Sequence, residues 1–373
     1  MEKLIDLSLK YQKLLITDPD SIYYFTGCST PGASFAALIV NKSQITLVVR
    51  DLEMSNYTKS GINIIPYSEQ TPVDIVANVL KQECIIGGHK VEVGFDGDSS
   101  RFSAADSQLL FKLLTFIKFT DVSKELKYMR VKKSNIEIDY ITKAASYVKN
   151  AYIIALNNIK IGMTETELSG WLNYGKMYSG SEWTAYPEFV SFGVNGCIGH
   201  HAASSDTKLK TGELVFMEIG ASHKRYHAAM MHCFWTGVPP VWFNRLKNCI
   251  KCAISVAKSI CVPGTRASDV DKVMRNIIEH AFDNCDIHFH PKFTILQRSG
   301  YSIGIGNATD WADKIVRITP TSNDIIEENM VLHLIPWLQI DDIGAMGFSD
   351  TVVVKNYGLQ SLFDEYYNQP LMQ

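Results

Sequence analysis

The second half of the chain repeats one pattern, in which apolar strand-like segments alternate with glycine-containing turns. Short apolar runs bounded by turn residues are typical of buried β-strands, whereas the longer segments between them have the spacing of helices. The predicted strands are Leu214–Gly220, Tyr226–Thr236, Met330–Pro336 and Asp350–Lys355. The predicted helices are Trp242–Val262 and Ala267–Phe282. Elements in this order predict a mixed α/β (α+β) domain.

The first third of the chain predicts a separate, smaller α/β domain. Two strand segments, Ala36–Val40 and Gln44–Val49, flank a polar turn and form a predicted hairpin. The predicted helices of this region are Ile75–Leu80 and Ser107–Leu114. The chain has 373 residues, which is long for one domain, and its sequence becomes strongly charged near residue 125. We therefore expect domains at residues 1–125 and 126–373.

Composition excludes several kinds of partner. The formal net charge of −3 and the isoelectric point near 6.4 give no basis for binding nucleic acid or an anionic membrane. The first residues lack a continuous apolar run, and no later stretch approaches the roughly 18 apolar residues of a membrane helix. We expect a cytoplasmic protein with no nucleic-acid or membrane partner. Its only Cys-x-x-Cys pair, Cys249 and Cys252, is expected to be reduced.

A more specific signal comes from glycine-marked segments in a fixed order. The segments are Asn195–His201 with Gly212–Ala221, Tyr226–Gly237, Gly300–Gly306 and Met330–Pro336. Their order and spacing resemble the catalytic domain of the creatinase, prolidase and methionine aminopeptidase superfamily, peptidase family M24. A weaker likeness extends over the N-terminal region. The resemblance implies a small creatinase-like domain followed by a pita-bread domain, in which helices back a curved antiparallel sheet.

The resemblance also locates the metal-binding positions of the superfamily. In its peptidases two aspartates, a histidine and two glutamates hold two divalent ions. The first aspartate falls on Glu218, which keeps a carboxylate, and the other four positions fall on Ala229, Tyr301, Ile335 and Ser349. Hard divalent ions need several convergent oxygen or imidazole ligands, which one carboxylate cannot supply. We therefore expect no metal site and no cofactor.

Among superfamily members without the metal cage are creatinase and the ectoine hydrolases, which open C–N bonds with side chains alone. The segments at Arg225 and Gly300–Gly306, with Asp310 beyond, most resemble the ectoine hydrolase branch. The acidic residues of creatinase fall near Met231 and Ser349 here, which departs from creatinase. The expected function is metal-independent hydrolysis of a non-peptide C–N bond in a small amidine, guanidino or cyclic amino-acid derivative. The alternatives are a metal-dependent Xaa-Pro dipeptidase or aminopeptidase and a non-catalytic binding protein.

Glu218 is the first candidate for catalysis. It lies in the apolar segment Leu214–Gly220, where a carboxylate loses hydration and its pKa should rise unless a cation or donors compensate. A proton held near neutral pH suits general acid or base catalysis, and a carboxylate can also add to an activated amidine carbon. The alternative is a structural carboxylate held by backbone donors or by Arg225.

His200 and His201 are the second candidates. Counting forward from Asn195 places the active-site histidine of the superfamily on His200, whereas counting back from Gly212 places it on His201. We favour His201 because the downstream spacing is longer and better anchored. Imidazole suits proton transfer to a leaving nitrogen near neutral pH. A pair of exposed loop histidines is the alternative.

Further residues are candidates for substrate binding. They are Tyr301, His333, His227, Asp341 and Asp342. Tyr301 lies in a predicted glycine-rich turn that lacks the Gly-Lys-Ser/Thr pattern of a phosphate loop. Alternate residues of a strand face opposite sides, so the correspondence of Ala229 to a ligand position favours the face that carries His227. Asp341 and Asp342 are candidates for holding a cationic group, although a solvated turn explains them as well.

Arg50 closes the predicted N-terminal hairpin. In the creatinase-like branch this region reaches into the pocket of the neighbouring subunit. The resemblance therefore implies a homodimer in which Arg50 binds a substrate carboxylate bidentately. An ordinary charged turn is the alternative.

Overall fold

The computed structural model describes residues 2–28, 34–42, 44–57, 62–68, 71–82, 91–283, 298–307 and 310–363. The chain divides into two compact units, Met1–Arg130 and Val131–Gln373. The boundary expected near residue 125 falls within helix α5 (Ser123–Tyr128), shortly before this division.

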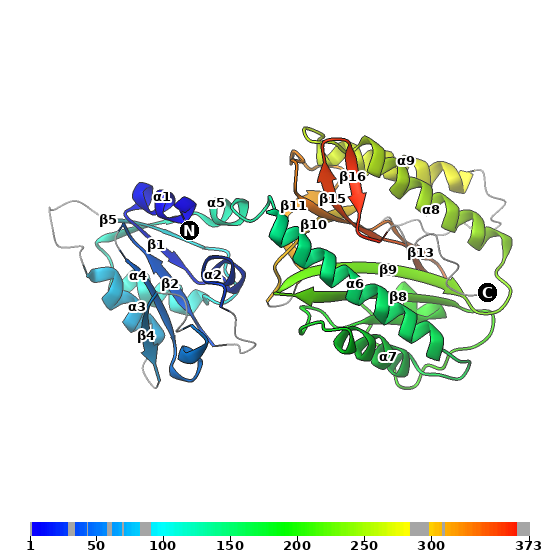
Figure 1. Ribbon diagram of the computed structural model, residues 1–373, viewed down its shortest axis with the longest axis horizontal. Coiled ribbons are helices and arrows are strands. Elements are labelled where there is room, and N and C mark those ends of the chain that lie inside the picture. Colours follow the sequence, from blue (N-terminus) through cyan, green and yellow to red (C-terminus); the bar gives the residue numbers. More distant parts are fainter. Residues whose placement is uncertain are drawn as a thin grey trace. The chain divides into compact units, whose positions relative to one another are not determined.

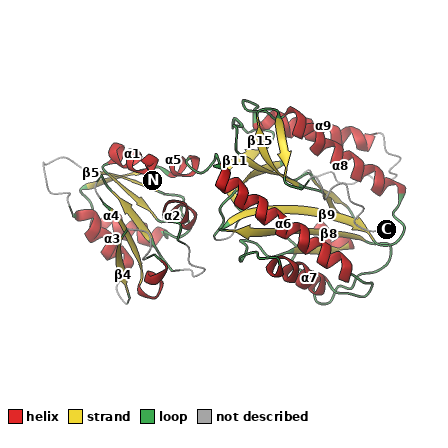
Figure 2. Ribbon diagram, viewed as in Figure 1, coloured by secondary structure: helices red, strands yellow, loops and turns green. Residues whose placement is uncertain are grey.

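Unit 1 is a mixed six-stranded sheet with helices on both faces (Figure 2), in the order β4-β3-β2-β1-β5-β6. Its strands are β1 (Lys13–Ile16), β2 (Ala37–Val40), β3 (Ile45–Arg50), β4 (Asn63–Tyr67), β5 (Val91–Phe95) and β6 (Ile117–Asp121). Its helices are α1 (Glu2–Tyr11), α2 (Pro19–Thr26), η1 (Asp51–Asn56), α3 (Pro72–Lys81), α4 (Ala104–Leu113) and α5. Successive residues of β1 face opposite sides, so Leu15 packs with α3 and α4, and Leu14 packs with α1, α2 and α5.

The N-terminal predictions hold with shifted ends. The hairpin is confirmed, since β2 and β3 pair antiparallel with Val40 opposite Ile45. The two predicted helices correspond to α3 and α4, and both begin earlier than their apolar spacing indicates. Proline occupies the first turn of α3, and the Ser103 side chain accepts a hydrogen bond from Asp106 N to cap α4. Polar and proline residues therefore set these helix starts.

The described part of unit 2 contains a three-stranded, a five-stranded and a two-stranded sheet (Figure 1), with helices packed against them. The strands are β7 (Phe189–Phe192), β8 (Leu214–His223), β9 (Tyr226–Trp235), β10 (Gly300–Ile303), β11 (Ala312–Ile318), β12 (Val331–Leu334), β13 (Trp337–Ile340), β14 (Gly344–Gly347), β15 (Asp350–Lys355) and β16 (Gly358–Ser361). The helices are α6 (Asn135–Asn158), α7 (Glu165–Tyr178), η2 (Gly193–Cys197), α8 (Val241–Ile260) and α9 (Ala267–Asp283). This is the predicted pita-bread arrangement, with β7-β8-β9 and β11-β10-β12-β15-β16 as its larger sheets.

Helix α6 lies across β8 and β9 (Figure 1). The Tyr152 hydroxyl on α6 lies 3.1 Å from the Met217 carbonyl oxygen and 2.7 Å from that of Met230, which ties the helix to both strands. The spacing of Thr164 and Glu167 in the sequence predicts a capping box, and this box begins α7: the side chain of each residue bonds the backbone N–H of the other. None of the described helices combines the length and apolar character that crossing a membrane requires.

One local prediction was wrong. The segment from Gly300 was expected to be a turn, but Gly300–Ile303 forms β10, which pairs antiparallel with both β11 and β12. A β-carbon on Gly300 would lie 2.7 Å from the His333 carbonyl oxygen of β12. The glycine therefore permits close strand pairing. The predicted strand Met330–Pro336 is also shorter, because β12 ends at Leu334.

Candidate active site

One face of the sheet β7-β8-β9 opens onto a cavity. In antiparallel pairs, directly opposed residues share a face. Phe189 of β7 lies opposite Glu218 of β8, which lies opposite Met231 of β9. Two residues earlier on β8, Phe216 lies opposite Ser191. All five side chains belong to the cavity wall, so the strand register alone brings them together.

The cavity has a volume of about 380 Å³. Its wall comprises Phe189, Val190, Ser191, Gly196, Ile198, Gly199, His200, His201, Phe216, Glu218, Met231, Arg298, Ile335 and Trp337. Most of these residues are apolar, and the ionisable ones are Glu218, Arg298, His200 and His201. A small apolar pocket with a few polar groups is the usual form of a small-molecule site.

Glu218 is 8% exposed, and the part of the chain that the structure describes provides its carboxyl group with no hydrogen bond or ion pair. Burial raises the pKa of Glu218 to about 8; the nearby Arg298 guanidinium acts to lower it and Asp310 acts to raise it. The pKa rise predicted from the apolar strand is confirmed. A carboxyl group that exchanges its proton near neutral pH is able to act as a general acid or base.

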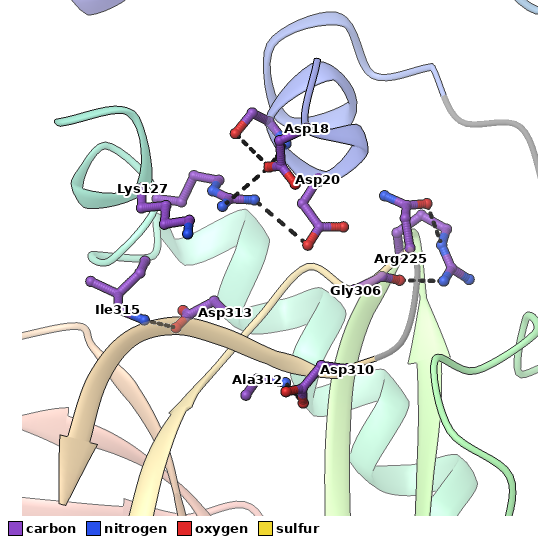
Figure 3. Close-up of polar contacts among 12 residues, drawn as sticks. Asp18, Asp20, Lys127, Arg225, Gly306, Asp310, Ala312, Asp313 and Ile315 are labelled. Carbon is purple, nitrogen blue, oxygen red and sulfur yellow. Dashed lines mark hydrogen bonds and ion pairs between the residues drawn. The ribbon is translucent and has the colours of Figure 1, made fainter. Parts of the chain in front are cut away.

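The side chain of Arg225 does not hold Glu218. Its guanidinium donates to the Gly306 carbonyl oxygen (Figure 3). It also donates to Asn307 Oδ1 over 3.1 Å. It also lies 3.4 Å from the centroid of the Trp183 ring. Arg225 thus anchors the turn between β8 and β9 to the segment that follows β10.

His201 is held by a buried carboxylate. Its Nε2 lies 2.7 Å from Glu165 Oε2 at the first position of α7, and Glu165 is fully buried. The two carboxylate oxygens also accept from Phe192 N at 2.7 Å, Asn195 Nδ2 at 3.0 Å and Ser204 N at 2.8 Å. This network fixes the ring of His201, and no described residue bonds its Nδ1, which is therefore able to transfer a proton.

His200 also lies at the cavity, but in a different setting. Its side chain is exposed. Its backbone φ is +55°, a value that residues with a β-carbon rarely adopt. Its ring centroid lies 5.2 Å from that of Phe189 and 6.1 Å from that of Tyr186. Both histidines line the cavity, and of the two only His201 has a carboxylate partner among the described residues.

The residues at the metal positions of the superfamily do not fit a divalent cation. Ala229 and Tyr301 are buried in the sheets, and Ile335 contributes an apolar side chain to the cavity wall. Ser349 is fully buried. Across the described ranges, no group of three or more His, Cys, Asp or Glu side chains is gathered as a metal site requires. Glu218 therefore lacks the companions that a metal cage needs.

Two of these positions belong to a closed hydrogen-bonded chain, which we call the Tyr301–His333 network. Trp311 Nε1 donates to the Tyr301 hydroxyl at 2.7 Å, and that hydroxyl lies 3.0 Å from His333 Nδ1. His333 Nε2 lies 2.7 Å from Ser349 Oγ, which accepts from Met231 N at 2.6 Å. Burial lowers the pKa of His333 to about 3, so its ring is neutral. Tyr301 and His333, predicted to bind substrate, instead bond to each other behind the cavity wall.

His227 likewise lies outside the cavity wall. Its Nδ1 lies 3.0 Å from the Arg225 carbonyl oxygen, and Ala185 N donates to its Nε2 at 3.3 Å. Because a carbonyl oxygen only accepts, Nδ1 carries the proton. Burial lowers the pKa of His227 to about 3. The prediction that His227 shares a strand face with Ala229 and Met231 was correct. At the His227 end of β9, however, backbone groups bond to the ring.

The remaining candidates are also outside the cavity wall. Asp341 and Asp342 form the turn between β13 and β14, where Asp342 is exposed and has a φ of +60°. Arg50 ends β3 in unit 1 and is exposed.

Sequence reasoning missed three polar residues of this region. Arg298 precedes the Gly300 motif by two residues, and that adjacency was a usable signal. Glu165 follows the capping residue Thr164, where an acidic side chain has an ordinary explanation in the helix dipole. Ser191 carries no sequence signal.

Two family models match the chain. Residues 139–356 match the metallopeptidase family M24 model, and residues 8–132 match the creatinase/prolidase N-terminal domain model. The ectoine hydrolase of Halomonas elongata is 26% identical over 326 residues, which cover 84% of this chain and 77% of that protein. The Xaa-Pro dipeptidase of Pyrococcus furiosus is 24% identical over 351 residues, covering 94% and 92%.

Solved structures show the same fold. The prolidase of Pyrococcus furiosus superposes with a TM-score of 0.79 at 23% identity, covering 95% of this chain and 97% of that one. The X-Pro aminopeptidase of Thermotoga maritima superposes with a TM-score of 0.83 at 20% identity, covering 97% and 96%.

Proposed function

The chain belongs to metallopeptidase family M24, and from that premise we propose a hydrolase that opens a non-peptide C–N bond without a metal ion. The observation that carries the proposal is the contrast at the metal positions. Glu218 keeps a carboxyl group at the cavity, while Ala229, Tyr301, Ile335 and Ser349 offer no metal cage. The proposed substrate is a small amidine, guanidino or cyclic amino-acid derivative.

The chemistry of such substrates suits side chains acting alone. The central carbon of an amidinium or guanidinium group is already electron-poor, whereas a peptide carbonyl usually needs stronger polarisation. A bound cation beside Glu218 would also lower the pKa of its carboxyl group and favour the ionised form. The carboxylate is then able to act as a general base.

In the proposed reaction a water oxygen adds to the amidine carbon while ionised Glu218 takes a proton from that water. The tetrahedral adduct collapses as protonated His201 gives a proton to the departing nitrogen and the C–N bond breaks. An amidine yields an amide and an amine, a guanidino group yields a urea and an amine, and the two products stay joined in one molecule when the broken bond belongs to a ring. Glu165 supports this role by fixing the His201 ring.

The cavity volume of about 380 Å³ supports a small substrate, since it lies near the lower end of the usual range for ligand pockets. The likeness to a protein named ectoine hydrolase supports the non-peptide bond. The comparable likeness to an Xaa-Pro dipeptidase supports the alternative of a metal-dependent peptidase, which would need ligands that the positions above lack.

The proposal has two further parts, of which only the second rests on the resemblance. One is a cytoplasmic location. The other is a homodimer, in which Arg50 of the partner subunit completes the pocket. Light scattering on active protein checks the dimer, and a fully active monomer would contradict it.

The deciding experiment is an incubation of chelator-treated protein with ectoine, creatine and a set of Xaa-Pro dipeptides. Mass spectrometry of the products identifies the bond that breaks, and Glu218→Gln serves as the inactive control. We expect water to add across a C–N bond of a cyclic amidine or guanidino compound. Cleavage of the dipeptides alone, dependent on added Mn²⁺ or Zn²⁺, would refute the proposal.

A further inference from the structure

The cavity wall contains a cation that the proposed reaction does not use. Arg298 lies just before β10 and is half-buried, and its guanidinium carbon stands 4.1 Å from the centroid of the Tyr301 ring. In the described part of the chain, no acceptor lies within hydrogen-bond distance of this guanidinium and no carboxylate pairs with it. Stacking fixes the plane of the guanidinium, and none of the described residues occupies its N–H donors.

The electrostatic balance of the cavity favours an anion beside Arg298. Burial raises the pKa of Glu218 to about 8, so in the free protein at neutral pH this carboxyl group is mostly uncharged. The nearby Asp310 is not part of the cavity wall, and its Oδ1 accepts from Ala312 N at 2.9 Å. Arg298 is therefore a permanent charge of the cavity wall, whereas Glu218 gains its charge when a cationic ligand arrives.

A second polar group in the wall lacks a partner. Ser191 is 2% exposed, and the described residues give its hydroxyl oxygen no hydrogen-bond partner. A buried hydroxyl without a partner costs free energy, so such groups usually bond to a ligand or to water. Ser191 shares the Glu218 face of the sheet, which directs it toward an occupant of the cavity.

We propose that Arg298 binds a carboxylate of the ligand and thereby determines which amidines or guanidino compounds this cavity accepts. The ligand is then an amino-acid derivative with two features, an electron-poor C–N carbon facing Glu218 and a carboxylate facing Arg298. Ser191 hydrogen-bonds to a polar atom of the same molecule. Arg298 belongs to the same unit as Glu218, so this carboxylate site exists in a single subunit. The reaction at the C–N carbon rests on the proposed function, whereas carboxylate binding does not.

The test measures binding, which separates this inference from turnover. Titration calorimetry of the full-length protein uses ectoine, creatine and an Xaa-Pro dipeptide, each paired with its neutral carboxamide. A charged, bidentate hydrogen-bonded pair accounts for about tenfold to hundredfold in affinity. We expect at least one acid to bind wild-type protein at least tenfold more tightly than its amide. Arg298→Gln should weaken binding of the acid by a similar factor and leave the affinity for the amide nearly unchanged. The variant should therefore no longer prefer the acid over the amide.

Matched variants exclude an indirect effect. Arg317→Gln changes an exposed arginine of β11 and should leave both affinities unchanged. Arg298→Lys keeps the charge without the fork and should recover part of the acid binding. Ser191→Ala should weaken acid and amide equally and by a few-fold. Melting temperatures of all variants check that the fold is retained.

Three results would overturn the inference. The first is that wild-type protein binds every acid and its amide with equal affinity. The second is that Arg298→Gln weakens the binding of acid and amide by the same factor. The third is that none of the probes binds. Acid-selective binding without turnover would refute the hydrolase and leave the role of Arg298 intact. Equal turnover of acid and amide would refute the role of Arg298 and leave the hydrolase intact.

Discussion

The sheet β7-β8-β9 and the sheet that contains β10, β12 and β15 differ in what they do with the metal positions of the family. On the first sheet Glu218 keeps a carboxyl group at an open cavity, where no described residue bonds to it. On the second, Tyr301 and Ser349 are joined through His333 in a closed, buried network. The first sheet thus presents a titratable carboxyl group to the cavity, whereas the residues of the second bond to one another.

The contrast explains how a site can lose metal ligands without losing its fold. Converging ligand side chains that have no ion leave polar groups unpaired, which costs free energy. The Tyr301–His333 network satisfies its members among themselves, and Ala229 and Ile335 remove polar atoms altogether. Of the five metal positions, Glu218 retains a cost of burial, which its raised pKa records. A perturbed pKa at a cavity is the reason that we propose Glu218 as the catalytic group.

Acid should produce the largest effect, since it acts on buried histidines of unit 2 that stay neutral in the folded state. Burial lowers the pKa of His227, His232 and His333 from 6.5 to about 3. Below pH 6.5 these histidines bind protons in the unfolded chain but stay neutral in the folded one. Their full contribution to the unfolding free energy is therefore present above pH 6.5 and is lost as the pH falls toward 3. We expect the unfolding free energy to fall by several kcal/mol, at most about 3 per histidine, between roughly pH 7 and pH 4.

Denaturant titrations across this pH range measure the effect. His232→Gln should flatten the pH dependence by up to one proton, while His280→Gln, at an exposed position of α9, should leave it unchanged. A wild-type protein equally stable at pH 4 and pH 7 would show that these rings are not buried neutral.

Glu218→Gln should have the next largest effect, on turnover. The amide keeps the volume of the side chain but cannot exchange a proton or carry a negative charge. We expect turnover to fall at least roughly 100-fold, the usual scale for loss of a positioned acid or base. Steady-state rates on the substrate identified by mass spectrometry measure the fall.

The same variant should lower turnover but raise the stability of the folded protein at high pH. The folded pKa of Glu218 is about 8 against 4.5 for the free group, so its contribution is most favourable below pH 4.5 and declines as pH rises to 8. Glu218→Gln removes this decline and should be more stable than wild-type protein above pH 8. A variant that unfolds more easily at every pH yet turns over normally would make Glu218 a structural anchor.

His200 and His201, which both line the cavity, should differ in their effect on turnover. His201→Asn should lower turnover by about 10-fold to 100-fold, because it removes a proton donor that Glu165 positions. His200→Asn should change turnover by only a few-fold. A larger loss in His200→Asn would reverse the assignment. Glu165→Gln should shift the pH dependence of turnover, which a purely structural role would not do.

Tyr301→Phe should break the closed network at a moderate cost. It removes the hydroxyl that bonds to Trp311 and His333, leaving both without this partner. We expect a loss of about 1–3 kcal/mol of unfolding free energy, seen as a lower melting temperature, with little change in turnover. The matched control is Tyr178→Phe, whose ring is 74% exposed. Equal melting of both variants would show that the network contributes nothing.

The smallest effect should follow metal removal. Purified protein should contain far less than one equivalent of Mn, Fe, Co or Zn, and chelation should leave turnover unchanged, because four of the family's ligand positions carry no ligand. Elemental analysis beside rates before and after chelation measures this. Activity that chelation abolishes and Mn²⁺ or Zn²⁺ restores would overturn the contrast between the two sheets.

Much of the fold was predictable because its signals are local. Short apolar segments bounded by glycine turns located β8 and β9, and the Thr164 and Glu167 spacing located the start of α7. The strand alternation also sorted residues onto the correct faces. The Gly300 segment was mistaken for a turn because glycine signals both a turn and a close strand contact. Local sequence does not distinguish these two uses.

The sequence by itself determined the family, which depends on residue identity at fixed spacing, and from the same spacing it predicts that four metal positions carry no metal ligand. It also determined that Glu218 sits in an apolar strand and that its pKa would rise. Tertiary structure alone decided the rest of the site. Glu165 meets His201 across 36 residues of sequence, and Tyr301 meets His333 across 32. Packing between distant segments selects these partners, and it leaves Arg298 open at the cavity, so no local pattern encodes them.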